Sequence, residues 1–292
     1  MKMPSNYFIN KKILITVDLE DWFQVENFKN YISTSQWENK ETRFRKNTIR
    51  ILELLETQGV KATFFVLGWC AKRDPYLIKE ILKSGHEIAS HGNMHVMCSK
   101  LSLKDLREDL YVCQKTLEDI TGLRVNGYRA PSFSVNDDVI EILKELGYMY
   151  DSSYNSFELN CRHGSLSIDK FSTRNDIAFQ DDDGFNELPV SNIKIFGRIL
   201  PWGGGGYFRL YPISLFKYGV SHFLKSDDAY LFYIHPWEID PDQPRVKSAS
   251  FFYKFRHYYN LSGCLKKLDF LIKSFKNCEF LTCSDYISFL NK

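Results

Sequence analysis

The residues of this 292-residue chain that could do chemistry are carboxylates, histidines and an arginine that directly follow short apolar segments. In chain order they are Asp18, Glu20, Asp21, His91, His95, Arg129, Asp151 and His235. Each apolar segment predicts a buried β-strand, and the carboxyl ends of parallel strands converge on one mouth of a barrel or open sheet. We therefore expect these side chains to meet, although they lie far apart in the sequence.

His91 and His95 have the spacing H-x3-H. On a helix or a tight turn this spacing places both imidazoles on one side, where they can share a metal ion. A carboxylate from Glu20 or Asp21 would complete a set of two histidines and one carboxylate with open positions for water and substrate. The alternative is a pair of surface histidines, and the neighbouring acidic cluster favours the metal interpretation.

Asp18 directly continues a predicted strand, so its carboxylate is expected to be partly buried and to need a partner. Arg129 could be that partner, because a guanidinium holds a carboxylate by paired hydrogen bonds. The alternative is an ordinary surface arginine. His235 ends the apolar segment YLFYIH, which is compatible with a catalytic histidine or with a satisfied core histidine.

Four consecutive glycines, residues 203–206, lie between Trp202 and Tyr207 and lack the Lys-Ser/Thr of a phosphate loop. They predict either a flexible turn or a close backbone approach to a ligand, with Trp202 or Tyr207 stacking on sugar. Trp237 adjoins His235 and could line the cleft or simply pack against it. The basic aromatic stretch at residues 256–260 is interpreted as docking the C-terminal part of the chain.

The elements that must position these residues alternate between strands and helices in the first half of the chain. Predicted strands lie at residues 13–17, 60–67, 86–90, 126–128 and 148–150, and predicted helices at 42–58, 75–85, 102–122 and 136–146. This alternation predicts parallel strands with crossover helices, hence a barrel or a doubly wound sheet.

The alternation ends near residue 155, where a polar stretch to residue 185 predicts an insertion over one face. Strand patterns return at residues 187–190 and 230–234, followed by a helix near 265–275 and a terminal strand–helix pair. We expect one domain over residues 1–292, with a catalytic core at about 12–240 and a C-terminal extension at about 241–292.

Composition excludes several classes of protein. The chain has 38 basic and 36 acidic residues, a net charge of +2, which gives no reason to expect a nucleic-acid partner. Its 7 cysteines are odd in number and show no C-x2-C pair, which argues against a zinc module or a disulfide framework. Because no signal peptide, transmembrane segment or amphipathic stretch is recognised, we expect a reduced, cytoplasmic protein with no structural role at a membrane.

Taken together, the motifs resemble the polysaccharide deacetylase family, also called carbohydrate esterase family four, which includes chitin-oligosaccharide and peptidoglycan N-acetylglucosamine deacetylases. Their order and spacing agree from about residue 12 to residue 240. The matching segments are TVDLED, KATFFVLG, GHEIASHGNMH, GYRAPSFS, YDSSY and YIHPWE. The later segments LPWGGGGYFRL and FRHYYNL look like a subgroup with a C-terminal extension that is found alongside exopolysaccharide production.

The resemblance implies an α/β fold, a distorted (β/α) barrel of about seven parallel strands, and a divalent metal, usually zinc. It also implies a role for each residue that matches a family motif. These are Asp18 as general base, His91 and His95 as metal ligands, Arg129 orienting the base, the backbone N–H of Phe133 as oxyanion donor, and His235 as general acid.

The chain departs from the family pattern at one point, because Leu19 rather than an aspartate follows Asp18. The metal carboxylate must therefore be Glu20 or Asp21. Asp151 matches a loosely defined motif and would orient His235 or contact sugar.

The function that follows is metal-dependent hydrolysis of N-acetyl groups on the amino sugars of a poly- or oligosaccharide, in cell-surface or exopolysaccharide biosynthesis. Two other functions stay open. One is hydrolysis of a small non-sugar amide on the same scaffold, and the other is carbohydrate binding without catalysis.

Overall fold

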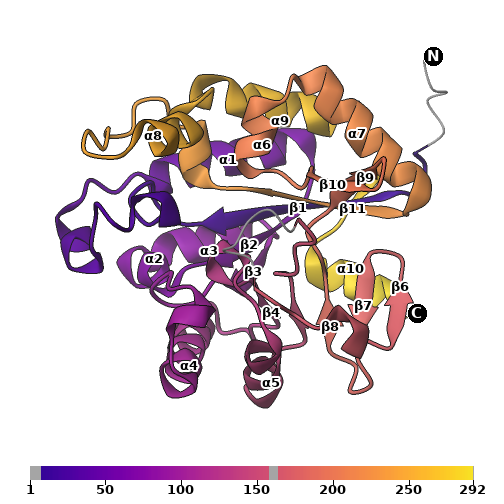
Figure 1. Ribbon diagram of the computed structural model, residues 1–292, viewed down its shortest axis with the longest axis horizontal. Coiled ribbons are helices and arrows are strands. Elements are labelled where there is room, and N and C mark those ends of the chain that lie inside the picture. The colour runs from indigo at the N-terminus through magenta and orange to yellow at the C-terminus, as the bar shows by residue number, and fades with distance from the viewer. Residues whose placement is uncertain (1–7, 158–163, 292) are drawn as a thin grey trace.

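A curled parallel β-sheet forms the centre of the protein (Figure 1). The computed structural model describes residues 8–157 and 164–291. Seven parallel strands follow one another in the order β11-β1-β2-β3-β4-β5-β8. Their bounds are β1 Lys12–Leu19, β2 Ala62–Val66, β3 Glu87–Ser90, β4 Gly127–Tyr128, β5 Tyr150–Asp151, β8 Asn186–Glu187 and β11 Ala229–Ile234.

The curl brings the two outer parallel strands, β8 and β11, towards each other. The segment that follows β8 bridges them, because the N–H of Leu231 donates to Ser191 Oγ at 2.9 Å. Further along β11, the N–H of Tyr233 donates to the carbonyl of Gly203 at 2.8 Å. The expected distorted α/β barrel is confirmed, with single contacts in place of a strand ladder at this seam.

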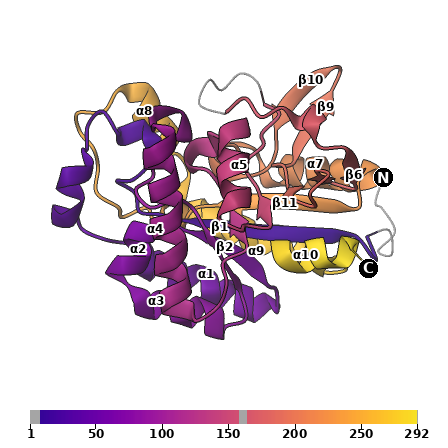
Figure 2. The ribbon, with the colours of Figure 1, turned by 90° about the horizontal axis from the view of Figure 1, so that it is seen from below.

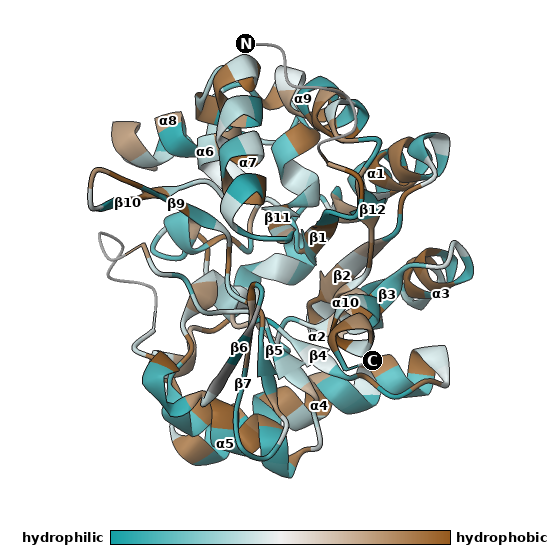
Figure 3. Cartoon of the chain, turned by 90° about the vertical axis from the view of Figure 1, so that its right-hand side faces the viewer, coloured by the Kyte–Doolittle hydropathy of each residue, from teal (hydrophilic) through white to brown (hydrophobic). Residues whose placement is uncertain are grey.

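Helices cover the outside of the sheet on both flanks (Figures 1 and 2). Their bounds are α1 Phe44–Gln58, α2 Gly68–Arg73, α3 Pro75–Lys83, α4 Leu103–Thr121, α5 Asp137–Glu145, α6 Gly205–Leu210, α7 Ile213–Ser226, α8 Phe251–Tyr258, α9 Leu261–Ser274 and α10 Cys283–Leu290. Most carry hydrophobic and hydrophilic residues side by side in Figure 3, as expected for helices with one face on a core.

Strand β1 has both faces buried, as is usual for parallel strands. Alternate side chains point to opposite faces, so Leu14, Thr16 and Asp18 share the inner face of the curled sheet. At the lower end of this face, α10 packs against Leu14, and Cys283 and Tyr286 belong to the same apolar cluster. The lower mouth is therefore closed by apolar packing, and polar chemistry is confined to the other end.

Several elements were not predicted. Within the expected insertion, β6 (Thr173–Asn175) and β7 (Ala178–Gln180) form a hairpin that pairs antiparallel with β8. A second hairpin joins β9 (Asn192–Ile195) to β10 (Arg198–Pro201). By contrast, the predicted terminal strand–helix pair is confirmed as β12 (Glu279–Phe280), which pairs with β1, followed by α10. Part of the predicted insertion, residues 158–163 with Cys161, lies outside the described residues.

The six cysteines within the described residues are free and buried. None of the helices in residues 8–157 and 164–291 is long and apolar enough to cross a bilayer.

Candidate active site

A cavity opens at the carboxyl ends of the parallel strands. Of the residues singled out in the sequence, its lining includes Asp18, Glu20, His91, His95, Phe133, Tyr207, His235, Trp237 and the glycines 203–206. They come from the ends of β1, β3 and β11 and from the loops beside them. The parallel topology therefore brings together side chains from both halves of the chain.

Glu20, His91 and His95 form a buried cluster whose possible ligand atoms all lie within 4.8 Å of one another. Glu20 Oε2 is 2.6 Å from His95 Nε2, yet this buried oxygen has no well-directed hydrogen-bond donor. His91 Nδ1 lies 2.8 Å from the carbonyl oxygen of Arg129, which leaves Nε2 on the opposite side of the ring. Two imidazoles and one undersatisfied carboxylate suit a divalent transition metal.

The two histidines lie on a tight turn rather than on a helix. Gly92 has φ 74° and His95 has φ 49°, both in the left-handed region. The carboxylate of Asp109 on α4 accepts the N–H of Asn93 at 2.8 Å and that of Met94 at 3.2 Å. Asp109 therefore holds the turn that carries both imidazoles, and the sequence pattern gave no sign of this role.

Asp18 and Arg129 form a buried ion pair, with 2.7 Å between Oδ1 and Nη1. Arg129 is fully buried, so it is not a surface arginine. Its remaining donors bind Thr16 Oγ1 at 2.7 Å and the carbonyl and hydroxyl of Ser152, both at 2.9 Å. The guanidinium thus orients the Asp18 carboxylate, whose second oxygen faces His235.

His235 lies on the other side of the cavity from the turn. Its Nε2 is 3.8 Å from Asp18 Oδ2 and 3.6 Å from Glu20 Oε1, and its Nδ1 is 3.0 Å from Glu238 Oε2. Burial acts to lower its pKa, but the hydrogen bond to Glu238 and the carboxylates of Glu20 and Asp18 raise the pKa of His235 to about 9. Without a bound cation the imidazole is therefore protonated at neutral pH.

Trp237 supports the site from behind. Its Nε1 donates to Glu20 Oε1 at 3.0 Å. Its ring stacks on His235, with 5.2 Å between centroids, and on His257, with 4.2 Å. Trp237 thus lines the cavity, as expected, and its ring also packs against the two imidazoles.

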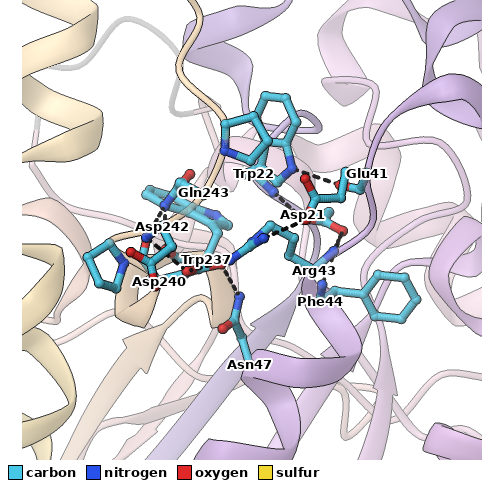
Figure 4. A network of polar contacts seen from close by, with 12 residues as sticks. Asp21, Trp22, Glu41, Arg43, Phe44, Asn47, Trp237, Asp240, Asp242 and Gln243 are labelled. Atoms are coloured by element: carbon cyan, nitrogen blue, oxygen red, sulfur yellow. Dashed lines mark hydrogen bonds and ion pairs between the residues drawn. The ribbon is translucent and has the colours of Figure 1, made fainter.

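Asp21 is not part of the cluster of Glu20, His91 and His95, and its carboxylate lies among Trp22, Arg43 and Phe44 instead (Figure 4). Its carboxylate accepts the backbone N–H groups of Trp22 at 2.8 Å, Arg43 at 2.6 Å and Phe44 at 3.1 Å. Burial raises its pKa to about 6 although these donors oppose the rise. Asp21 therefore holds the start of α1, and Glu20 is the carboxylate that stands beside the histidines.

Three further expectations need correction. Trp202 is not a sugar platform, because it is 4% exposed and stacks on Phe216 at 5.7 Å between centroids. The N–H of Phe133 is not available to an oxyanion, because it donates to the carbonyl of Ala130 at 2.9 Å. Tertiary packing and local hydrogen bonding, rather than sequence position, therefore decide the roles of these two residues.

Asp151 neither orients His235 nor lines the cavity. Its carboxylate accepts the hydroxyl of Ser153 at 2.6 Å and is hydrogen-bonded to the buried Glu187. The Ser153 hydroxyl in turn accepts the N–H of Ala130 at 2.7 Å. Asp151 thus supports the backbone next to Arg129 from within the core.

Three of the four glycines, Gly203, Gly204 and Gly205, are required by close packing rather than by flexibility. Gly204 has φ 137°, and a Cβ atom there would lie 2.0 Å from the carbonyl oxygen of Tyr233. Gly205 has φ 58° and lies against the ring of the same tyrosine. The backbone can therefore run along β11 at the cavity wall. Tyr207 also lines the cavity, and its stacking on sugar stays a prediction.

Two family profiles together match most of the chain. Residues 34–150 match the family described as Polysaccharide deacetylase. Residues 152–288 match the family described as Domain of unknown function (DUF3473). Asp18 and Glu20 precede the first match, and His235 and Glu238 lie within the second.

Individual proteins show the same similarity. A peptidoglycan-N-acetylglucosamine deacetylase of Bacillus cereus is 37% identical over 101 residues, 35% of this chain and 47% of that protein. A peptidoglycan deacetylase-like protein of Gibberella zeae is 36% identical over 106 residues, 36% of this chain and 31% of that protein. Each match thus spans less than half of the relative.

A crystal structure from Mycobacterium smegmatis, described as that of a candidate polysaccharide deacetylase, has the same fold. It superposes with a TM-score of 0.63 at 19% identity and covers 100% of this chain and 93% of its own.

Proposed function

Because this chain belongs to the polysaccharide deacetylase family, we propose that it hydrolyses N-acetyl groups on the amino sugars of a poly- or oligosaccharide. The observation that carries the proposal is the convergence of Asp18, Glu20, His91, His95 and His235 on one cavity. A buried carboxylate held by an arginine, a cluster able to bind a metal and a protonated imidazole are the parts that amide hydrolysis requires.

Glu20, His91 and His95 would hold a divalent metal, with zinc the first choice for two imidazoles and a carboxylate. Such an ion, when bound, lowers the pKa of a water molecule and polarises the acetamide carbonyl. The undersatisfied Oε2 of Glu20 supports this assignment, because a buried carboxylate oxygen without a donor is costly unless a cation neutralises it.

Asp18 is proposed as the general base. Its Oδ2 accepts a proton from water as the water oxygen attacks the acetamide carbon. Arg129 binds the other oxygen, Oδ1, and so holds the carboxylate in its orientation. Because Arg129 is itself held by buried hydrogen bonds, the Asp18–Arg129 ion pair is fixed in this orientation.

His235 is proposed as the general acid. Its Nε2 proton passes to the sugar nitrogen as the carbon–nitrogen bond breaks, which yields acetate and a free amine. The geometry supports this role, because Nε2 lies 3.8 Å from Asp18 Oδ2 while Glu238 Oε2 contacts Nδ1.

The backbone at residue 132 replaces Phe133 as the proposed oxyanion donor. Ser132 lines the cavity and has φ 56°. Within the described residues, no backbone acceptor is found for its N–H. A peptide N–H in that position could stabilise the charge that develops on the carbonyl oxygen.

The proposed substrate is an extended N-acetylated glycan, and a role in cell-surface or exopolysaccharide biosynthesis is part of the proposal. The names of the matching proteins and the open cavity with Tyr207 at its wall support this proposal.

The test combines elemental analysis of the purified protein with acetate release from N-acetylglucosamine oligomers, peptidoglycan fragments and a cyclic amide. We expect about one zinc per chain and acetate from the glycans. Zinc-loaded protein that releases no acetate from any glycan would contradict the proposal. Turnover of the cyclic amide alone would favour the small-amide hydrolase, and glycan binding without turnover would favour a binding protein.

A further inference from the structure

Residues 152–288 carry no assigned function in the matching family, yet they contain the residue pair that contacts His235 from behind. We propose that Glu238 and Arg209 are positioning residues that hold His235 with its Nε2 facing the reacting amide. The inference rests on the proposed function, in which His235 is the acid.

Glu238 contacts His235 at two points. Its Oε2 accepts the backbone N–H of His235 at 3.1 Å and lies 3.0 Å from Nδ1 of the imidazole. Binding of Nδ1 by a carboxylate fixes the ring orientation and leaves Nε2 to act. In this chain Nε2 faces Asp18 and Glu20.

Arg209 in turn holds Glu238. Its Nε donates to Glu238 Oε1 at 2.8 Å, and both side chains are 1% exposed. Its Nη1 donates to the carbonyl oxygen of His257 at 2.9 Å, and its Nη2 donates to that of Arg256 at 3.0 Å. The guanidinium therefore ties the carboxylate to the end of α8, so neither Glu238 nor the imidazole can turn independently.

This arrangement explains why Asp151 has no contact with His235. A buried carboxylate already occupies Nδ1, and its countercharge comes from Arg209 on α6. The second family region is thus an integral part of the active site rather than an appendage. It provides the acid, the carboxylate that orients it and the cation that neutralises that carboxylate.

The kinetic test uses Glu238→Gln, with Glu141→Gln at a 69% exposed position as the matched control. We expect Glu238→Gln to lower kcat for N-acetylglucosamine oligomers by roughly 10–100-fold with unchanged zinc content and a KM within about twofold. Arg209→Lys keeps the positive charge but not the paired N–H donors of the guanidinium. Its kcat should therefore lie between those of wild type and Glu238→Gln. Wild-type kcat in zinc-loaded Glu238→Gln would overturn the proposal.

A second readout does not need activity. In proton NMR of the zinc-loaded protein, an imidazole N–H bound to a carboxylate gives a far-downfield resonance, which the His235→Asn variant would assign by its disappearance. We expect Glu238→Gln to shift or abolish it. If the resonance is unchanged, the positioning role is wrong. If wild type shows it but releases no acetate, the proposed function fails while the contact stands.

A different observation concerns the outer face of α8. Four large aromatic side chains point to solvent, Phe251 (82% exposed), Phe252 (65%), Phe255 (47%) and Tyr259 (40%). On a helix with about 100° between residues, the three phenylalanines form one stripe, and Tyr259 follows directly after the helix as its C-cap. His257, which is fully buried, points the opposite way. An outward apolar stripe of this size on a helix marks an interaction surface.

The charges around the stripe indicate which partner it fits. Residues 241–260 contain four cationic side chains, Arg245, Lys247, Lys254 and Arg256, and one carboxylate, Asp242. Lys254 and Arg256 fall on the two sides of the aromatic stripe. Aromatic rings flanked by long cationic side chains fit the surface of an anionic lipid bilayer.

We infer that the outer face of α8 docks on an anionic membrane surface. Since Arg256 also lines the catalytic cavity, docking would bring the cavity close to the lipid headgroups. This inference does not depend on the proposed function. It also replaces the expectation that the chain has no amphipathic stretch suited to a membrane.

The test is co-sedimentation with vesicles of phosphatidylcholine alone or with phosphatidylglycerol. We expect binding only to the anionic vesicles, weakened by salt, and at least about tenfold weaker in the triple variant Phe251→Ser/Phe252→Ser/Phe255→Ser. The control is Leu215→Ser/Tyr218→Ser, which removes the exposed apolar groups of α7. Acetate release from a short soluble oligomer should be unchanged in both variants.

Three results would overturn the membrane inference. They are no binding of wild type to anionic vesicles, equal binding of wild type and the triple variant, or retention of soluble polysaccharide that only the triple variant loses. The last result would identify the face as a carbohydrate platform.

Discussion

Replacing Asp18 by asparagine tests the base and its arginine partner in one step. Asparagine keeps an oxygen that can accept from Arg129 but cannot accept a proton from water. Loss of a positioned general base lowers turnover by roughly 10²–10⁴-fold. Removing one partner of a buried ion pair costs about 3–5 kcal/mol. Arg129 keeps its bonds to Thr16 and Ser152, so we expect the lower end of this range, about 3 kcal/mol.

The assay measures kcat for N-acetylglucosamine oligomers, zinc content and urea unfolding on the same preparation. Zinc content should be unchanged, because Asp18 is not in the cluster of Glu20, His91 and His95. Asp119→Asn, at an exposed position of α4, is the matched control. Zinc-loaded, folded Asp18→Asn with kcat within about threefold of wild type would refute the assignment of Asp18 as base.

Three other predictions follow from the site and from its surroundings. Glu20→Gln should weaken zinc binding at least about tenfold, whereas Asp21→Asn should lower Tm and leave zinc affinity within about twofold of wild type. The affinities are measured by chelator competition. If Asp21 were the ligand, Asp21→Asn rather than Glu20→Gln would lose zinc affinity. Gly92→Ala should weaken zinc binding by roughly tenfold, because φ is 74° and the added Cβ would lie 2.9 Å from a carboxylate oxygen; unchanged affinity in the same titration would contradict this. Burial and then the charge of Lys61 lower the pKa of His86 to about 4, so its contribution to stability is complete above pH 6.5 and is lost as the pH falls toward 4. Between pH 7 and pH 5, the free energy of unfolding measured in urea should fall by up to about 2 kcal/mol less in His86→Gln than in wild type. Equal falls in the two proteins would exclude His86 as the source.

The convergence of Asp18, His91, His95, Arg129 and His235 is predictable from sequence for a simple physical reason. Each follows an apolar strand, and parallel strands present their carboxyl ends at one mouth. The parallel α/β arrangement of the first half of the chain follows from the alternation of strands and helices, and the number of strands was expected only from the family resemblance. What the pattern leaves undecided is which way each polar side chain turns after its strand ends.

Glu20 and Asp21 illustrate this limit. They are adjacent, and their different destinations depend on the start of α1, whose N–H groups at Arg43 and Phe44 bind the Asp21 carboxylate. Glu238 and Arg209 were missed because their significance lies in a contact between separate elements. A glutamate three residues after His235 carries no signal by itself until α6 brings a guanidinium to it.

Asp151 and Trp202 fail as site residues for a related reason. Both adjoin motifs, but neighbouring core groups, Glu187 for Asp151 and Phe216 for Trp202, take up their polar atoms or ring faces. Proximity in sequence to a functional motif does not determine which way a side chain faces, because burial of large rings and pairing of carboxyl groups act over the whole core.

The position of β1 between β2 and β11 has a consequence for biosynthesis. The pairing of β1 with β2 involves neighbouring parts of the chain, but its other edge pairs with residues 229–234. Until that segment leaves the ribosome, an apolar strand edge stays open, and open edges recruit other chains. Folding should therefore finish late in synthesis, and slow translation of the second half should increase aggregation and dependence on chaperones.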